Sequence, residues 1–372
     1  SGATLPAKEY LCKKLSEVGG AAAVPALAIL LMDPETSDMA RFALQRIPHP
    51  SAGDVLRTAL QHTTGNIRIG IISTLGMRKD AQAVSVLARL TADPDPLTAA
   101  AAVAALGHIA DESALDALAQ CKNTASGPLR ELALDEYLKC AQAQAVNGHK
   151  KKAMAAYDEL SGADIPEPIR AAALRGKVET LGGGAGALII ETIKGGDPAM
   201  QSAAIAVVRR LKDAKAIKDI SNELVHLSPE NKVRLIAALA DCGEPEALPS
   251  VLAAATDPEA AVRMAALKAL AVLGDASAVV PLAKQAATAQ GNEAEAARDS
   301  LNRLRGDAVD AALLTAMESA EAPVKIEVIR AAAARKTEGA APLLVKCAAD
   351  ADCGVRAEAR KALQDIGNQG VL

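Results

Sequence analysis

Histidine and cysteine are the residue types best suited to metal binding and nucleophilic chemistry. This 372-residue chain has five histidines and six cysteines. A metal site needs such residues at close spacings, for example i and i+3 or i+4 on one helix. The histidines form no ligand cluster of this kind, and the motifs His-Glu, His-Glu-x-x-His and Cys-x-x-Cys are absent. The cysteines are scattered, which favours free, buried thiols. The residues concerned are His49, His62, His108, His149, His226, Cys12, Cys121, Cys140, Cys242, Cys347 and Cys353.

Residues 182–186 are rich in glycine, as are loops that bind phosphate groups. A P-loop also needs a preceding strand and a following Lys-Ser or Lys-Thr, and neither pattern is present. The nucleophile motif Gly-x-Ser-x-Gly is absent, and no cysteine has a histidine near it in the sequence. We interpret residues 182–186 as a loop between helices, and we expect a protein with no enzyme activity, metal or cofactor.

One group of basic and aromatic residues is typical of a partner-binding surface. The chain has a single triple-lysine run, and two of its four aromatic residues lie near that run in the sequence. Aromatic and basic side chains often dominate the binding energy of protein interfaces. The alternative is that the two tyrosines only fill space between helices. The candidate partner-binding residues are Tyr137, His149, Lys150, Lys151, Lys152 and Tyr157.

Other classes of partner find less support in the sequence. Basic residues also cluster at 209–215 and 298–305, but no aromatic residues are interleaved with them and the net charge is -4. This pattern argues against nucleic acid as the partner. No apolar run of about 18 residues is present, so we expect no membrane insertion. We expect a monomer that binds a protein, and localisation stays open.

The composition indicates which elements must position these residues. Half of the residues are hydrophobic but only 1% are aromatic, and alanine is abundant. Alanine favours helices, whereas a sheet core needs β-branched and aromatic residues. High apolar content with a small net charge also argues against disorder. The composition therefore predicts a folded, all-α protein.

Three patterns recur at intervals of about 31 residues. Leu-Gly or an equivalent pair ends a helix-like run, as at Leu75-Gly76 and Cys242-Gly243. An acidic residue, two further residues and Ala then open a second helix. Asp-Pro or Ser-Pro opens the next first helix, because the cap accepts amide hydrogens and Pro fits the first helical position. Together the three patterns predict about eleven two-helix units and a cap helix from about residue 351. The units start near residues 4, 36, 66, 95, 126, 166, 197, 228, 257, 291 and 321.

One unit, at about 126–165, has about eight extra residues. Residues 129–146 read as one long first helix, and residues 153–157 read as part of the second. Insertions in repeat proteins map to loops, where binding residues concentrate. This unit contains the candidate partner-binding residues named above.

Residues 257–282 resemble a HEAT-like repeat of the bacterial, bilin-lyase type, and the resemblance extends over almost the whole chain. It implies a right-handed α-solenoid of about eleven stacked antiparallel helix pairs, with residues 1–372 as a single domain. It also implies that capping aspartates and helix arginines bond between neighbouring repeats. The residues carried over to this ladder are Asp164, Arg170, Asp257, Arg263, Asp350 and Arg356.

The resemblance also implies a function. We expect a non-catalytic scaffold or adaptor that binds a protein on the concave face formed by the second helices, and that could be a module of a larger bacterial protein. The similarity of residues 6–38 to modules of multidomain bacterial proteins would favour export. Two alternatives stay open: a lyase-like or ligand-binding repeat protein, and a nucleic-acid-binding protein.

Overall fold

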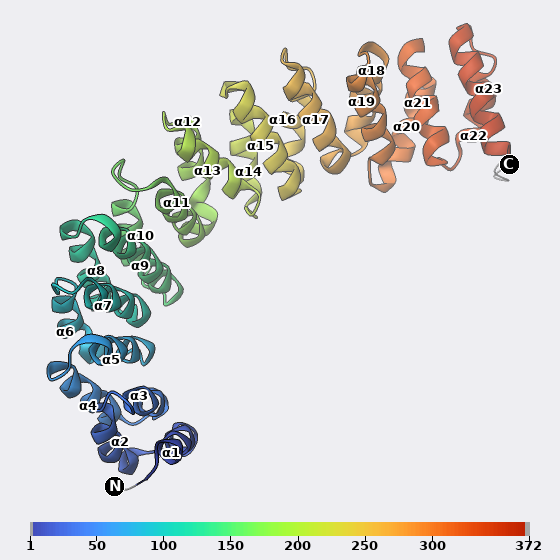
Figure 1. Cartoon of the computed structure of the whole chain (residues 1–372). Helices are drawn as coiled ribbons and strands as arrows, with labels where there is room; N and C mark the ends of the chain where they lie inside the picture. Colours follow the sequence, from blue (N-terminus) through green and yellow to red (C-terminus); the bar gives the residue numbers. More distant parts are fainter. Residues whose placement is uncertain (1–2, 369–372) are drawn as a thin grey trace. The chain divides into compact units, whose positions relative to one another are not determined.

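The computed structural model describes residues 3–368, and every regular element within them is a helix. The chain divides into two compact units, residues 1–180 and residues 181–372, which are described separately here. Figure 1 shows the order of the helices along the chain. The prediction of an all-α protein built from stacked helix pairs is confirmed.

The first unit holds five helix pairs and most of an eleventh helix. Its helices are α1 (Leu5–Val18), α2 (Val24–Leu31), α3 (Ser37–Arg46), α4 (Pro50–Gln61), α5 (Gly65–Met77), α6 (Val84–Leu90), α7 (Pro96–Ile109), α8 (Glu112–Thr124), α9 (Gly127–Val146), α10 (Lys150–Glu159) and α11 (Glu167–Leu181).

The second unit continues the same alternation and ends in a single helix. Its helices are α12 (Ala185–Lys194), α13 (Pro198–Val208), α14 (Ala214–Asn222), α15 (Pro229–Cys242), α16 (Leu248–Ala254), α17 (Ala260–Leu273), α18 (Val279–Thr288), α19 (Asn292–Arg303), α20 (Asp307–Ser319), α21 (Ala322–Arg335), α22 (Ala340–Cys347) and α23 (Cys353–Asn368). Each odd-numbered helix begins within three residues of the start predicted from the repeat.

Acidic residues cap the second helices as the pattern predicts. The Asp111 carboxylate accepts a 2.7 Å hydrogen bond from the Ala114 amide, and Asp213 accepts one of 2.9 Å from the Ala216 amide. These bonds satisfy amide donors that a helix start otherwise leaves unpaired. Glu244 occupies the equivalent position but makes no such side-chain bond.

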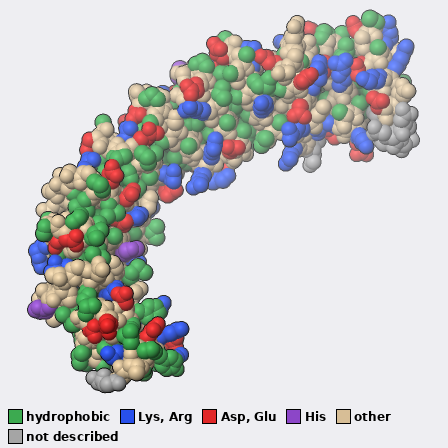
Figure 2. All heavy atoms as spheres, viewed as in Figure 1, with side chains coloured by type: hydrophobic (Ala, Val, Ile, Leu, Met, Phe, Trp, Pro, Cys, Tyr) green, Lys and Arg blue, Asp and Glu red, His purple; other side chains and the backbone are tan. Residues whose placement is uncertain are grey.

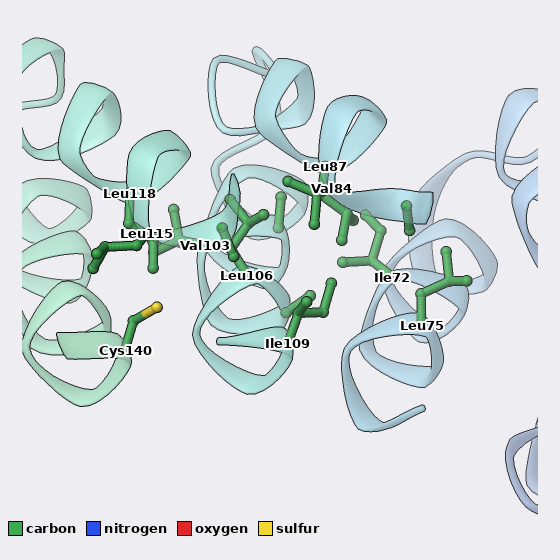
Figure 3. Close-up of a cluster of buried hydrophobic side chains, with 14 of the residues drawn as sticks. Ile72, Leu75, Val84, Leu87, Val103, Leu106, Ile109, Leu115, Leu118 and Cys140 are labelled. Atoms are coloured by element: carbon green, nitrogen blue, oxygen red, sulfur yellow. The ribbon is translucent and has the colours of Figure 1, made fainter. Parts of the chain in front are cut away.

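In the first unit the core is a continuous layer of mostly aliphatic side chains between the helices. Figure 3 shows one section of it, in which Ile72, Val103 and Leu118 come from three different helices. Eight leucines and valines from helices of both units are at most 1% exposed: Leu75, Leu87, Leu106, Leu118, Val251, Leu267, Leu270 and Leu282. Leu363 is only partly buried, since no further helix follows α23 in the described residues.

The glycines predicted to end the first helices have two different roles. Gly243 does end α15 in the left-handed conformation, with φ of 74°. For Gly76 the prediction is wrong, because it lies inside α5 and the left-handed residue is Lys79. A Cβ at Gly76 would lie 2.7 Å from the Cα of Ala105, so the missing side chain lets α5 and α7 approach closely.

The helices of the first unit form two layers. Odd-numbered helices pack along one another more extensively than even-numbered helices do. A stack curves toward its more closely spaced layer, and within residues 3–180 Figure 1 shows the odd-numbered helices on the inner side of the curve. The prediction that the second helices line the concave side is therefore wrong for this unit.

Candidate partner-binding surface

The irregular fifth repeat contains the partner-binding residues predicted from the sequence. Its first helix, α9, is 20 residues long and contains the long helix predicted at residues 129–146, and residues 160–166 form a connection to α11. Tyr137 and Tyr157 are only 3% and 1% exposed. Side chains so deeply buried do not contact a partner on the surface, which supports the alternative that these tyrosines fill space between helices.

The contacts of the two tyrosines explain their burial. The Tyr137 hydroxyl donates a 3.1 Å hydrogen bond to Glu159, and the Lys122 ammonium lies 5.1 Å from the centre of the Tyr137 ring. Burial, reinforced by the nearby Glu159 carboxylate, raises the pKa of Tyr137. The Tyr157 ring packs where a Cβ of Gly176 would otherwise stand.

The basic residues of the candidate site divide into two groups. Lys152 Nζ forms a 2.7 Å ion pair with Glu112, and His149 Nδ1 lies 3.3 Å from the same carboxylate. The hydrogen bond from Lys152 is the main cause that lowers the pKa of Glu112. Lys150 and Lys151 are exposed and form no ion pair in the described part of the chain. All four basic residues are exposed, but within the described residues only Lys150 and Lys151 have no acidic partner in this chain and are free to pair with one on a partner.

Ion pairs do link neighbouring repeats, but with different partners from those predicted. The Asp257 carboxylate pairs with Lys232 at 2.7 Å, and Asp350 pairs with Lys325 at 3.0 Å. In both cases the lysine precedes the aspartate by 25 residues. Asp164 pairs with Arg130 at 2.7 Å, across the longer fifth repeat.

Two of the three predicted arginines, Arg263 and Arg356, instead bind main-chain oxygens or a glutamate. Arg263 donates to the carbonyl of Asp257 at 2.9 Å and forms a 2.7 Å ion pair with Glu293 on α19. Arg356 donates to the carbonyl of Asp350 at 2.8 Å. The six-residue spacing thus places Arg263 and Arg356 over the loops that precede their own helices. The carboxylates of Asp257 and Asp350 are bound instead by lysines of the preceding repeats.

The structure reveals a second candidate surface, which the sequence analysis missed. Helices α3, α5, α7 and α9 carry equivalent residues 31 positions apart, and residues four apart on one helix lie on the same face. We call this surface the inner face. It consists of Asp38, Phe42, Arg46, Ile69, Ser73, Met77, Ala100, Ala104, His108, Glu131, Asp135 and Lys139, all exposed or partly exposed.

The inner face carries apolar side chains that the core does not use. Phe42 is 41% exposed and Met77 is 55% exposed. On α1, Leu11 precedes Phe42 by one repeat and is 53% exposed. The 31-residue spacing could have identified these positions from the sequence. Each one lies on a first helix, on the side opposite the one that is buried in the core.

The rest of the molecule offers grooves of mixed character. A groove between α17 and α19 is lined by charges of both signs, including Lys268, Glu295 and Arg303. In Figure 2, positive and negative side chains are interspersed over residues 181–368 on the face drawn. Among residues 3–368, no group of three potential ligands could hold a metal ion, and no helix is long and apolar enough to cross a membrane.

The fold and its surface define a class of protein, the α-helical repeat solenoids. The family profile described as HEAT repeats matches residues 24–96, 54–137 and 217–302, which together make up more than half of the chain. The chain belongs to the HEAT-repeat family. A comparison with curated protein sequences finds no match.

Several solved structures are similar to this chain at low sequence identity. Kap121p bound to Nup53p is 11% identical, with a TM-score of 0.50, and the match covers 91% of this chain and 45% of that one. The Kap95:Nup1 complex is 13% identical, with a TM-score of 0.49 and coverages of 97% and 58%. The chain thus spans about half the length of these Kap chains. Human deoxyhypusine hydroxylase is 22% identical, with a TM-score of 0.31 and coverages of 68% and 96%.

Proposed function

We propose that this chain is a non-catalytic scaffold that binds a protein partner through the inner face of α3, α5, α7 and α9. The observation that carries the proposal is the exposure of Phe42 and Met77 on a face whose positions on the middle helices α5 and α7 include no Asp, Glu, Lys or Arg. Exposed apolar side chains grouped on one face are typical of protein-binding sites. Kap121p, a solved structure with the same fold, is bound to Nup53p.

The proposal includes the organisation of the chain. We infer that residues 1–372 act as one monomeric solenoid, which contains the longer repeat at about 126–165. The resemblance of the repeats to bacterial ones extends the proposal to a module of a larger bacterial protein. Lys150 and Lys151, which are exposed on α10, are the competing site on the outer layer.

The proposal is tested by quantitative affinity capture with three forms of the protein. Ser73→Arg with Ala104→Arg places two charges in the middle of the inner face, and Lys150→Glu with Lys151→Glu reverses the competing site. We expect a set of proteins to be retained by the wild type and by the lysine variant but lost from the arginine variant. Loss from the lysine variant alone would move the site to α10. Retention by all three forms would contradict both locations. Circular dichroism and urea unfolding check that the variants fold.

A further inference from the structure

We infer that the occupant of the inner face is an amphipathic α-helix of the partner, with acidic residues at one end and basic residues at the other. The inference rests on the proposed function and adds the chemistry of the partner. It follows from the distribution of charge along the face and from the hydrogen bonding of the solenoid backbone.

Charge on the inner face is separated by helix. Arg46 on α3 forms no ion pair in the described part of the chain, and its guanidinium lies 4.1 Å from the centre of the Phe42 ring. Asp38 on α3 is paired with Arg41. The α3 end of the face therefore presents a net positive charge.

The α9 end has the opposite sign. Glu131 and Asp135 are exposed and form no ion pair within residues 3–368. Lys139 is paired with Glu136 on the same helix, at 2.7 Å. The unpaired charges at this end are thus two carboxylates, and a ligand that lies along the face meets a cation at one end and anions at the other.

The middle of the face carries no Asp, Glu, Lys or Arg and is in part made of small residues, with His108 near the end of α7 as its titratable group. On α5 and α7 the outward positions include Ile69, Ser73, Ala100 and Ala104, with Met77 beside them. Small side chains let a second helix approach closely, and the apolar ones cover its apolar stripe. A charged residue of the partner would be desolvated here without a counter-charge, which costs free energy.

Backbone chemistry selects a helix over an extended segment. An extended peptide gains affinity by pairing its main chain with a sheet edge. Every regular element in the described part of this chain is a helix, whose interior amides and carbonyls are already paired along the helix. A partner helix satisfies its own main chain and needs only side-chain contacts.

The length of the helix follows from the spacing of the repeats. Packed helices lie about 8–10 Å apart, so three steps from α3 to α9 span about 24–30 Å. At 1.5 Å per residue, a helix of about 16–20 residues covers this distance. Its acidic end should lie over Arg46 and its basic end over Glu131 and Asp135.

A charge-swap experiment with a defined peptide tests the inference. The probe is a synthetic 18-residue amphipathic helix with a leucine stripe, three glutamates at one end and three lysines at the other. Binding is measured by fluorescence anisotropy against a peptide with the same stripe and glutamine at the six charged positions. A third peptide carries two central prolines, which break a helix. We expect the charged helix to bind tightest and the proline peptide to bind at least tenfold more weakly.

Protein variants then assign the ends. Arg46→Glu alone, and Glu131→Lys with Asp135→Lys, should each weaken binding of the charged helix by about fivefold, because an exposed attraction becomes a repulsion. All three substitutions together should restore binding to within about twofold, with the helix reversed. Reversal of Lys150 and Lys151 is the matched control and should change nothing.

Three results would overturn the inference: equal binding of the charged and glutamine peptides, equal binding of the proline peptide, or no restoration in the triple variant. These results would leave the proposed function intact if the Ser73→Arg, Ala104→Arg variant still loses the proteins captured by the wild type. If that variant still bound both the peptide and the captured proteins, the proposed function itself would be contradicted.

Discussion

Arg78 Nη1 donates a 2.7 Å hydrogen bond to the carbonyl oxygen of Ile47, which lies 31 residues earlier, at the end of the neighbouring helix α3. The same nitrogen also contacts the carbonyls of Leu44 and Gln45. The Arg78 side chain thereby satisfies carbonyl groups at the open C-terminal end of the preceding first helix. In the second unit, Arg335 makes the equivalent bond to Leu304, at 2.7 Å and the same separation of 31 residues.

Replacing Arg78 should destabilise the fold through these carbonyls. Arg78→Ala leaves the end of α3 without its donors, and hydrogen bonds from charged groups contribute about 1.5–3 kcal/mol. We expect the free energy of unfolding to fall by about 2–3 kcal/mol in urea titrations. Arg89→Ala on α6 is the control, because Arg89 is exposed and its side chain makes no polar contact in the described structure. Equal effects of the two substitutions would contradict the role of Arg78.

Gly76→Ala should be costly although alanine normally favours a helix. The new Cβ would lie 2.7 Å from the Cα of Ala105, so the backbones of α5 and α7 must separate. We expect a loss of about 1–3 kcal/mol of stability, as for overpacked cores. Gly20→Ala serves as the control because no atom lies within 4 Å of its added Cβ. A stabilised Gly76→Ala protein would show that the two helices do not pack this closely.

Leu282→Ala should open a cavity between repeats in the second unit. Leu282 is 1% exposed, and removal of a buried leucine costs about 2–5 kcal/mol. Val280 lies on the same helix, α18, but is 49% exposed. Val280→Ala should therefore cost much less in the same denaturation series. If Leu282→Ala lowered the free energy of unfolding by less than about 0.5 kcal/mol, the side of α18 that carries Leu282 would not face the core.

Acid should weaken the link between the repeats of α15 and α17. The hydrogen bond from Lys232 holds the pKa of Asp257 below its ordinary value of 3.8. A pKa lowered in the folded state gives stability that is present above the unfolded pKa and lost as pH falls through the folded one. Asp257→Asn should thus be less stable than the wild type at pH 7, and the gap should close below pH 3.8.

Urea midpoints at pH 7, 5 and 3 measure this gap. Asp241→Asn is the control, since Asp241 pairs with Arg209 at 3.2 Å and both side chains are more than half exposed. An exposed pair contributes about 0–1 kcal/mol, so its gap should be small at every pH. A gap for Asp257→Asn that is unchanged at pH 3 would refute the contribution of the ion pair.

The six thiols should differ in reactivity. Five are buried, and Cys353 is exposed at the start of α23. Burial, with help from nearby carboxylates, raises the pKa of Cys140 to about 12, so its reactive thiolate is scarce at neutral pH. Iodoacetamide at pH 8 should modify Cys353 in the native protein and Cys140 only in denaturant. Mass spectrometry of tryptic peptides measures both, and modification of Cys140 before Cys353 would contradict the packing of α9.

The sequence determined the class of fold, the positions of the helices and most of the core. Helix caps such as Asp111 and apolar residues such as Leu282 act within one or two turns, so their spacing in the sequence carries the information. The 31-residue period repeated this information along the chain, and it located every first helix to within three residues. These local signals, which recur in successive repeats, were sufficient to predict the helices and most of the core.

Only the tertiary structure decided which surface is available to a partner. Tyr137 and Arg46 are both large polar side chains in first helices, yet one is buried between repeats and the other lies on the inner face. The partner of Asp257 was likewise decided by packing, because Lys232 reaches it from the preceding repeat. Burial and ion pairing across repeats depend on how closely neighbouring helices approach. That distance is set by contacts such as Gly76 against Ala105, between residues far apart in the sequence.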